Sequence, residues 1–168
     1  MTNPKVNSLN RVAGFFAGVL VVAIIAVAAF GIWAMAHREP SHLVSYTQTR
    51  VRINGFSVFA QVPSTAALQE QGLAGRTVLA DNQGMLWRYQ PPVIPTYWMK
   101  GMRLSLDFIW IANQQVVDLT ANVPVPTDSA ELPRYRPAVP VTEVLEVPAG
   151  FIQRHQVKIG TKVTFFAL

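Results

Sequence analysis

The stretch from Tyr97 to Ile111 constrains the fold more than any other part of the chain. It holds two tryptophans, two methionines, a lysine and an aspartate in a run that must be largely buried. Its second half alternates as a β-strand does, with successive side chains on opposite faces. One face carries Leu104, Leu106, Phe108 and Trp110, and the other carries Ser105, Asp107, Ile109 and Ile111. Because both faces are largely apolar, we expect a central strand here.

Asp107 is the costly residue of that strand, because its neighbours on the same face are isoleucines. A buried carboxylate needs a cation or several N–H donors, or its pKa rises and it becomes protonated. The candidate cations are Lys100, Arg103 and Arg76. Asp107 is therefore either a ligand-anchoring or acid/base group at a desolvated site, or a structural charge that fixes the fold. The structural reading is favoured, because structural networks also perturb pKa values.

Residues 13–36 impose a second constraint, since none of these 24 residues carries a charge or a strongly polar side chain. At about 1.5 Å per residue, such a helix spans about 36 Å and exceeds a hydrocarbon core of about 30 Å. The alternative is a cleaved signal peptide, with Lys5 and Arg11 as its basic region and Ala34-Met35-Ala36 as its cleavage site. The run is longer than the apolar region of a usual signal peptide, which favours an uncleaved transmembrane helix.

This segment divides the chain into four expected parts. Residues 1–12 form a short cytoplasmic tail, 13–36 the transmembrane helix, 37–48 a tether and 49–168 an extracytoplasmic domain. Glu39-Pro40 ends the helix. Long domains cross membranes largely regardless of charge, so we expect the amino terminus in the cytoplasm and the domain outside. The expected location is a single-pass membrane protein.

Short β-rich runs separated by turn residues dominate the rest of the chain. Asn54-Gly55 lies between two such runs and predicts a hairpin with a type I′ turn. Ser64 or Thr65 is the expected N-cap of a short helix over 66–70. The expected strands span 50–53, 56–59, 85–89, 104–112, 116–122, 141–147 and 162–167, with a helical turn at 151–155 and a long loop at 124–140. We therefore expect a mainly β (α+β) fold, a compact antiparallel, barrel-like domain with one or two short helices.

Composition argues against several kinds of site. The chain has no cysteine, and its histidines, His37, His42 and His155, show no ligand spacing. Residues 40–168 carry 11 Lys/Arg and 8 Asp/Glu, a net charge of +3 that is dispersed rather than clustered as in a nucleic-acid binder. Signatures of nucleotide, metalloprotease and α/β-hydrolase sites are missing. We expect no metal, no cofactor and no nucleic-acid partner.

Two further residues could carry chemistry. Glu146 lies in the expected strand 141–147, and a second carboxylate beside Asp107 would suit two-carboxylate hydrolysis. The alternative, a surface or edge-strand glutamate, is favoured. Trp98 is the tryptophan least suited to a core, because it adjoins Lys100 after a proline-bent loop. Aromatic platforms of this kind bind sugars and peptides, although aromatic residues in β domains are mostly core.

Ordered motifs over about residues 56–166 resemble a known family. They are Gly72-Leu73-x-Gly75-Arg76, Gly84-Met85-Leu86, Trp98-Met99-Lys100 with Leu106-Asp107, and Leu145-Glu146-x-x-Ala149-Gly150. Together they resemble domain-of-unknown-function family 192, whose members are small β-rich domains, often behind a signal peptide or membrane anchor, without an established activity. The resemblance implies that the recurrent family positions are Arg76, Trp98, Met99, Lys100, Asp107 and Glu146. The chain departs from many members at Gly101-Met102, where they have Asn-Thr, at Ser105, where they have proline, and at Trp87 and Tyr89, where they have phenylalanine.

Three functions fit these observations. The favoured one is a membrane-anchored extracytoplasmic binding or accessory module, held in the membrane by residues 13–36. It would contact an envelope protein, a small molecule or a glycan through Arg76, Trp98, Met99, Lys100, Asp107 and Glu146. The second is a cell-envelope hydrolase with Asp107 and Glu146 as acid/base groups, and the third is a structural subunit of a membrane protein complex. The lack of a complete catalytic constellation in the sequence favours the binding module over the enzyme.

Overall fold

The computed structural model describes residues 46–127 and 132–168. The predicted cytoplasmic tail, the predicted transmembrane helix and nearly all of the predicted tether lie outside these residues. Within the described ranges, no helix combines the length and the apolar character needed to cross a membrane.

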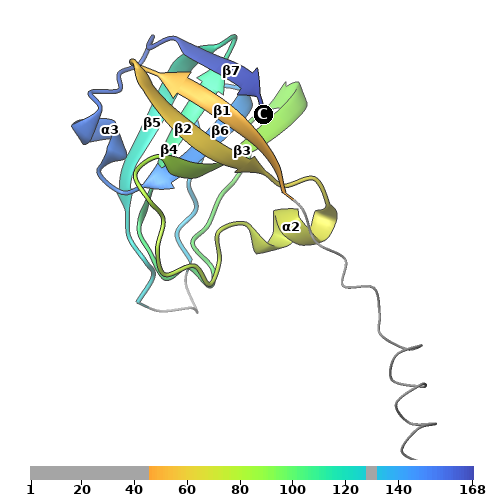
Figure 1. The fold of residues 1–168 in the computed structure, drawn as a ribbon. Helices are drawn as coiled ribbons and strands as arrows, with labels where there is room; N and C mark the ends of the chain where they lie inside the picture. Colours follow the sequence, from red (N-terminus) through yellow and green to blue (C-terminus); the bar gives the residue numbers. More distant parts are fainter. Residues whose placement is uncertain (1–45, 128–131) are drawn as a thin grey trace, which may run out of the picture. The chain divides into compact units, whose positions relative to one another are not determined.

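Seven strands and two short helices make up the described part of the chain (Figure 1). They are β1 (Thr47–Ile53), β2 (Phe56–Val62), α2 (Ala66–Gln71), β3 (Gln83–Val93), β4 (Leu106–Ala112), β5 (Gln115–Val123), β6 (Val141–Pro148), α3 (Phe151–Arg154) and β7 (Val163–Ala167). The strands form one sheet in the order β5-β4-β6-β3-β2-β1-β7. The prediction of a mainly β domain with one or two short helices is confirmed.

Both predicted hairpins form, because their turn residues accept positive φ angles. β1 and β2 are joined by Asn54 and Gly55, whose φ angles of 44° and 80° are both positive, as a type I′ turn requires. β4 and β5 are joined by Asn113 and Gln114, with φ angles of 51° and 60°. The right-handed twist of such turns matches that of the strands that they join.

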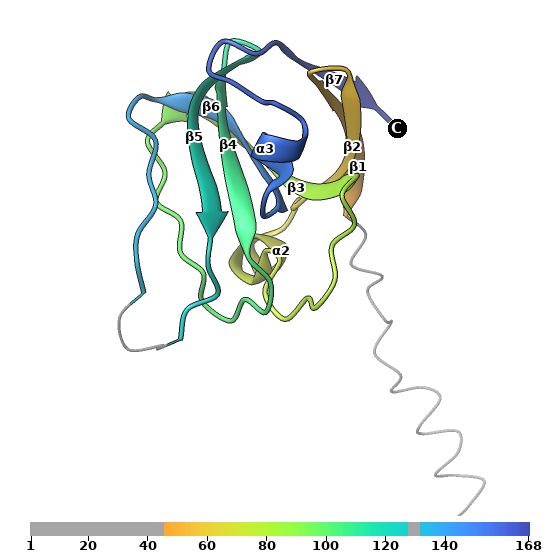
Figure 2. The ribbon, with the colours of Figure 1, turned by 90° about the vertical axis from the view of Figure 1, so that its left-hand side faces the viewer.

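The sheet is not closed into a barrel, so the barrel-like closure predicted from the sequence is wrong. It curves until β4 and β1 lie on opposite sides of α3 (Figure 2). The edges meet near the start of β5, where the N–H of Val116 donates to the carbonyl of Thr161 (2.9 Å) and the N–H of Gly160 donates to the carbonyl of Val116 (2.7 Å). The contact consists of these turn residues and one isolated bridge between Gln115 and Lys162, so β5 and β7 form no continuous ladder and the sheet stays open.

The direction of one strand pair also differs from the predicted antiparallel sheet. β2 and β3 run parallel, whereas every other neighbouring pair among the described strands is antiparallel. The physical reason is the connection between them. The segment that contains α2 carries the chain back along β2, so that Gln83 at the start of β3 pairs with Phe59 in the middle of β2. A parallel pair requires such a crossover.

Each face of the sheet carries its own hydrophobic core, and β4 supplies both. Ile109 and Ile111 pack into a first core with Phe151 of α3. Phe108 and Trp110 pack into a second core on the opposite face, with further residues that include Leu73, Met85, Met99 and Leu106. The alternation predicted for the central strand is therefore confirmed, and β4 is buried on both faces.

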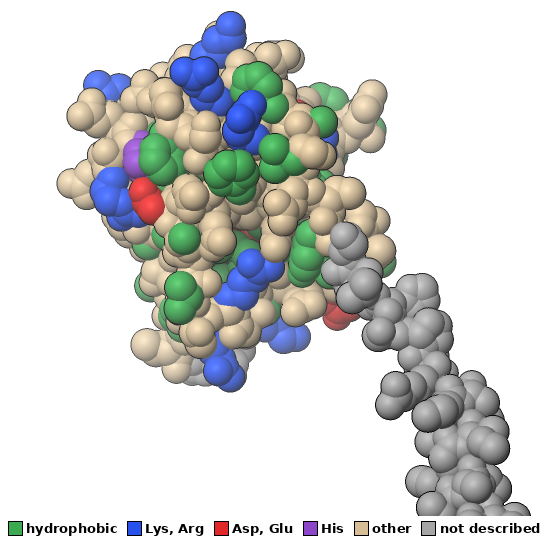
Figure 3. All heavy atoms as spheres, viewed as in Figure 1, with side chains coloured by type: hydrophobic (Ala, Val, Ile, Leu, Met, Phe, Trp, Pro, Cys, Tyr) green, Lys and Arg blue, Asp and Glu red, His purple; other side chains and the backbone are tan. Residues whose placement is uncertain are grey.

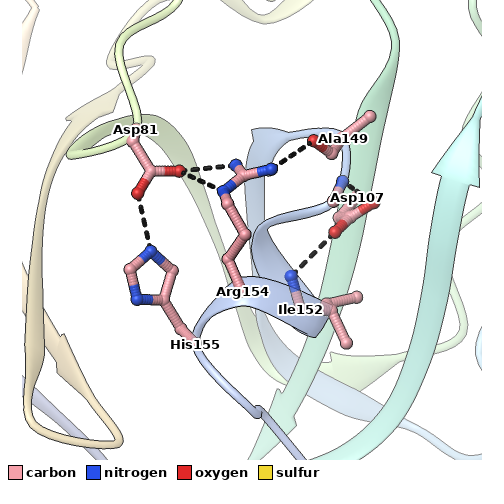
Figure 4. Close-up of polar contacts among 7 residues, drawn as sticks. Asp81, Asp107, Ala149, Ile152, Arg154 and His155 are labelled. Atoms are coloured by element: carbon pink, nitrogen blue, oxygen red, sulfur yellow. Dashed lines mark hydrogen bonds and ion pairs between the residues drawn. The ribbon is translucent and has the colours of Figure 1, made fainter.

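Asp107 is fully buried in this strand and is satisfied by backbone N–H groups instead of a cation (Figure 4). Its carboxylate accepts hydrogen bonds from the N–H groups of Asn122 (2.7 Å), Gly150 (3.2 Å) and Ile152 (2.9 Å). The cationic partners predicted from the sequence, Lys100, Arg103 and Arg76, form no ion pair with it within the described residues. Because its three donors come from β5 and from the start of α3, Asp107 has a structural role: it connects β4 to both of these elements.

We predict that Asp107→Asn lowers the free energy of unfolding by about 3 kcal/mol, because the amide cannot accept all three backbone hydrogen bonds. Urea unfolding of the full chain in lipid nanodiscs, followed by tryptophan fluorescence, measures this loss. Asp118→Asn is the matched control, since Asp118 accepts from Leu119 and Ala138 nearer the surface. Equal losses in the two variants would contradict a central structural role for Asp107.

Candidate ligand-binding site

A pocket of about 250 Å³ opens beside α2, on the face of the sheet that carries the second core. Its lining comes from α2 and the turn after it (Gln69, Glu70, Gln71, Gly72, Leu73, Ala74), from β3 (Trp87, Tyr89), from the loop before β4 (Thr96, Tyr97, Trp98, Met99, Lys100, Met102), from β4 (Leu106, Phe108) and from β6 (Glu146). Residues distant in the sequence therefore converge on one concave surface.

Local sequence explains how the two walls of the pocket are held. The hydroxyl of Thr65 accepts a hydrogen bond from the N–H of Leu68 and caps α2, as its sequence predicts. Gly72, with a φ of 52°, ends the helix and turns the chain. The N–H of Gly75 then donates to the carbonyl of Gly101 (2.9 Å), which ties the turn after α2 to the opposite wall.

Four aromatic residues of the lining give the pocket its character. The hydroxyl groups of Tyr89 and Tyr97 lie 2.7 Å apart and share a hydrogen bond. The rings of Trp87 and Tyr97 meet edge to face, with their centroids 5.7 Å apart. Trp98 is 49% exposed, and the guanidinium of Arg134 lies 4.6 Å from its ring centroid. The pocket therefore offers both apolar contact area and ring faces that attract cations.

Glu146 is the buried acid of the pocket, with 5% of its surface exposed. It pairs with Phe108 of β4 and with Met85 of β3 across neighbouring strands. Burial raises its pKa to about 8, although the indole N–H of Trp87 lowers the value somewhat. That indole nitrogen is too poorly placed to form a normal hydrogen bond with the carboxylate or with any other described group. Burial also raises the pKa of Tyr97, and the charge of Glu146 adds to this shift.

The structure brings four of the six predicted site residues together. Trp98, Met99, Lys100 and Glu146 all line the pocket. Trp98 and Lys100 lie on its exposed part, whereas Met99 is buried in its wall. Arg76 lies elsewhere, hydrogen-bonded to the side chain of Gln61 and packed against the ring of Tyr46.

Asp107, the sixth predicted residue, is close to Glu146 in the sheet but points away from it. Val147 is the partner of Asp107 across β4 and β6, and Glu146 is the partner of Phe108. Side chains one residue apart in register point to opposite faces of a sheet. The structure therefore does not bring the two carboxylates together, which removes the geometry required for two-carboxylate hydrolysis.

A second polar cluster, formed by Asp81, Arg154 and His155, was missed by sequence reasoning (Figure 4). Asp81 accepts hydrogen bonds from Arg154 and pairs with Nε2 of His155 (2.6 Å), and the His155 ring lies against Phe56 and Phe151. Burial raises the pKa of Asp81, but the hydrogen bonds and charges of Arg154 and His155 together lower it by more. The net pKa therefore lies below its ordinary value of 3.8. No pattern in the sequence indicates that Asp81 contacts Arg154 and His155, because they lie more than seventy positions apart. These contacts attach α3 to the segment before β3.

Tyr89, Tyr97 and the end of α2 also belong to the pocket, although sequence reasoning did not assign them to the site. Met85, Trp87 and Tyr89 are spaced two residues apart along β3, so their side chains lie on the same face of the sheet. Because Met85 pairs with Glu146, this is also the face of the Glu146 carboxyl group. This alternation is visible in the sequence, but its meaning depends on knowing that β3 pairs with β6. In the described residues, no cluster of three His, Asp or Glu side chains is arranged to hold a metal ion.

We predict that Glu146 makes the stability of the domain depend on pH. Between its ordinary pKa of 4.5 and the folded value of about 8, the folded chain retains a proton that the unfolded chain releases. The free energy of unfolding should therefore fall as the pH rises through this window, by up to about 1.4 kcal/mol per pH unit. Glu146→Gln should remove this slope, and Glu143→Gln on the same strand should keep it. Urea unfolding at pH 5, 6.5 and 8 measures the slopes, and parallel lines for wild type and Glu146→Gln would contradict the prediction.

Known proteins resemble this chain in sequence and in fold. A protein of unknown function from Novosphingobium aromaticivorans is 30% identical, with a TM-score of 0.62, over 75% of this chain and 89% of that chain. A protein from Sinorhizobium meliloti, provisionally described as a transcription regulator, is 29% identical, with a TM-score of 0.61, over 73% of this chain and 96% of that chain. No functionally curated protein matches. The sequence pattern of DUF192 (uncharacterized ACR) matches residues 49–165, which is more than half of the chain. The chain therefore belongs to DUF192, a family of uncharacterized proteins.

Proposed function

We propose that this protein is a membrane-anchored extracytoplasmic binding module that takes a small organic molecule into the pocket beside α2. The observation that carries the proposal is the pocket itself, in which aromatic walls surround a buried carboxyl group. Ligand pockets are typically concave and mostly apolar, with a few polar groups that orient the ligand. At about 250 Å³ the pocket has room for a single-ring compound.

A binding role fits the geometry better than hydrolysis by the pair Asp107 and Glu146. Asp107 is already occupied by three backbone N–H groups on the other face of the sheet. Glu146 alone cannot supply both an acid and a base for that mechanism. Trp98 and Lys100, in contrast, are exposed at the pocket and available for contact with another molecule.

The membrane part of the proposal rests on the apolar segment 13–36 and is supported by the surface of the domain. The outer face of β1, β2 and β7, here called the basic face, carries Arg50 and Arg52 together with the exposed rings of Phe59 and Phe166. None of these three strands contains Asp or Glu. Figure 3 shows cationic and hydrophobic side chains mixed over this side of the domain, with few acidic side chains among them.

Such a face suits the surface of an anionic bilayer. Each Lys or Arg near a negatively charged leaflet contributes about 1 kcal/mol of attraction, and aromatic rings partition to the interface. β1 begins at Thr47, within the last two residues of the predicted tether 37–48, so the predicted tether leads into a strand of this face. We therefore place the basic face towards the bilayer.

We predict that Trp98→Ala weakens the binding of benzyl alcohol by about tenfold, because the ring supplies exposed contact area at the pocket. Ligand-observed NMR on the full chain in lipid nanodiscs measures this affinity, with empty nanodiscs as the background. Phe59→Ala is the matched control, since Phe59 has a similar exposure of 41% on a different face. Binding that is absent in the wild type for benzyl alcohol, benzylamine and benzoate alike would refute the proposed pocket.

We further predict that the basic face approaches anionic lipid. Because the chain has no cysteine, Ser57→Cys on β2 gives a single site for an environment-sensitive fluorophore. The emission should shift to the blue in nanodiscs that contain phosphatidylglycerol, relative to nanodiscs of phosphatidylcholine. The double change Arg50→Glu and Arg52→Glu should abolish the shift, whereas Arg103→Glu with Arg136→Glu, which alters the net charge equally, should preserve it. A shift that both double variants abolish equally would show a net-charge effect and contradict the assigned orientation.

A further inference from the structure

The two buried carboxyl groups among the described residues, those of Asp107 and Glu146, differ in how their burial is compensated. Asp107 accepts three backbone hydrogen bonds, which compensate for its burial. Glu146 is more than nine-tenths buried, and it forms no ion pair within residues 46–127 and 132–168. Among the described side chains, the donor that favours its charged form is the indole N–H of Trp87, and that group makes no hydrogen bond of normal geometry there. An uncompensated buried carboxyl is costly, and this one lines a pocket.

The groups around Glu146 would complement a positive charge. Trp87, Tyr89 and Tyr97 present aromatic rings to the same pocket, and ring faces attract cations. Trp98 already attracts one, because the guanidinium of Arg134 lies 4.6 Å from its ring centroid. A buried acid beside aromatic rings is therefore matched to a cationic group that carries an apolar body.

The other charged groups at the pocket do not reverse this preference. Glu70 of α2 and Lys100 of the loop before β4 line the pocket, and both are exposed to solvent. Exposed charges are screened by water and salt, whereas a charge at Glu146 acts in a low dielectric. The tyrosine hydroxyls of Tyr89 and Tyr97 bond to each other. Glu146 therefore dominates the electrostatics of the interior, and Lys100 acts on the solvent-facing end of a ligand.

We propose that the pocket selects a small organic amine, whose protonated nitrogen reaches Glu146 while its apolar body lies against Trp87, Tyr97 and Trp98. The inference rests on the proposed binding function and names the charge of the ligand. Because burial raises the pKa of Glu146 to about 8, the carboxyl group is largely protonated at pH 7 in the empty pocket. Binding of the cation then converts the carboxylic acid into a carboxylate and releases one proton to solvent.

Three ring compounds of nearly equal size test this inference: benzylamine, benzyl alcohol and benzoate. Isothermal titration calorimetry on the full chain in phosphatidylcholine nanodiscs compares them at pH 6, 7 and 8. Benzylamine should bind at least about tenfold more tightly than benzyl alcohol at pH 8, and benzoate most weakly. The benzylamine affinity should fall towards pH 6, by up to about tenfold per pH unit, because one proton must leave Glu146. Buffers of different ionisation enthalpy should reveal the released proton.

Matched variants assign the preference to Glu146. Glu146→Gln should lower the affinity for benzylamine to that for benzyl alcohol and remove the proton release. Glu143→Gln, on the same strand but outside the pocket, should retain the preference. If benzyl alcohol binds and benzylamine binds no more tightly, the amine inference is wrong and the pocket function stands. If benzoate binds most tightly, Lys100 selects the ligand and the inference is also wrong, whereas failure of all three compounds refutes the pocket function itself.

Discussion

The pairing of β4 with β6 is the interaction on which the rest of this domain depends. β4 is buried on both faces, so its antiparallel ladder with β6 forms the boundary between the two cores. The register sets Asp107 opposite Val147 and Phe108 opposite Glu146. Because the partners of Asp107 and Glu146 are shifted by one residue, the two carboxyl groups point to opposite faces of the sheet. Asp107 joins β5 and α3, and Glu146 faces the pocket. A slip by one residue would exchange the two faces, and the apolar core on each side opposes it.

Local signals account for much of the fold, and long-range pairing accounts for the rest. Asn54-Gly55 and the alternation of β4 predicted a hairpin and a central strand, because both depend only on neighbouring residues. The parallel entry of β3 beside β2 and the open edge of the sheet could not be predicted in this way. They depend on contacts between segments that lie apart in the sequence. The N–H of Phe59 donates to the carbonyl of Asn82 beside β3, and the N–H of Val116 donates to the carbonyl of Thr161 at the open edge.

The residues of the candidate site also fall into two groups, those with a local signal in the sequence and those that depend on long-range contacts. Trp98 was noticed because it adjoins Lys100 after a proline-bent loop, and Glu146 because it is a carboxylate within an expected strand. Both also lie at recurrent positions of the family that the sequence resembles. The partners of Asp107 were not foreseeable, because backbone N–H groups carry no mark in a sequence. The cations of the basic face were also misleading, since Arg50 and Arg52 looked dispersed until β7 brought Phe166 and the nearby Lys162 beside them.

The place of β1 in the sheet has a consequence for how the chain is made. β1 lies between β2 and β7, so the first strand of the domain is completed by the last one. During synthesis, the β1–β2 hairpin must wait for residues 163–167 while one of its edges is exposed. Contacts of this sequence separation slow folding, and an unpaired edge invites association with other chains. A chain cut short before residues 163–167 would therefore leave this edge of β1 unpaired and open to association with other chains.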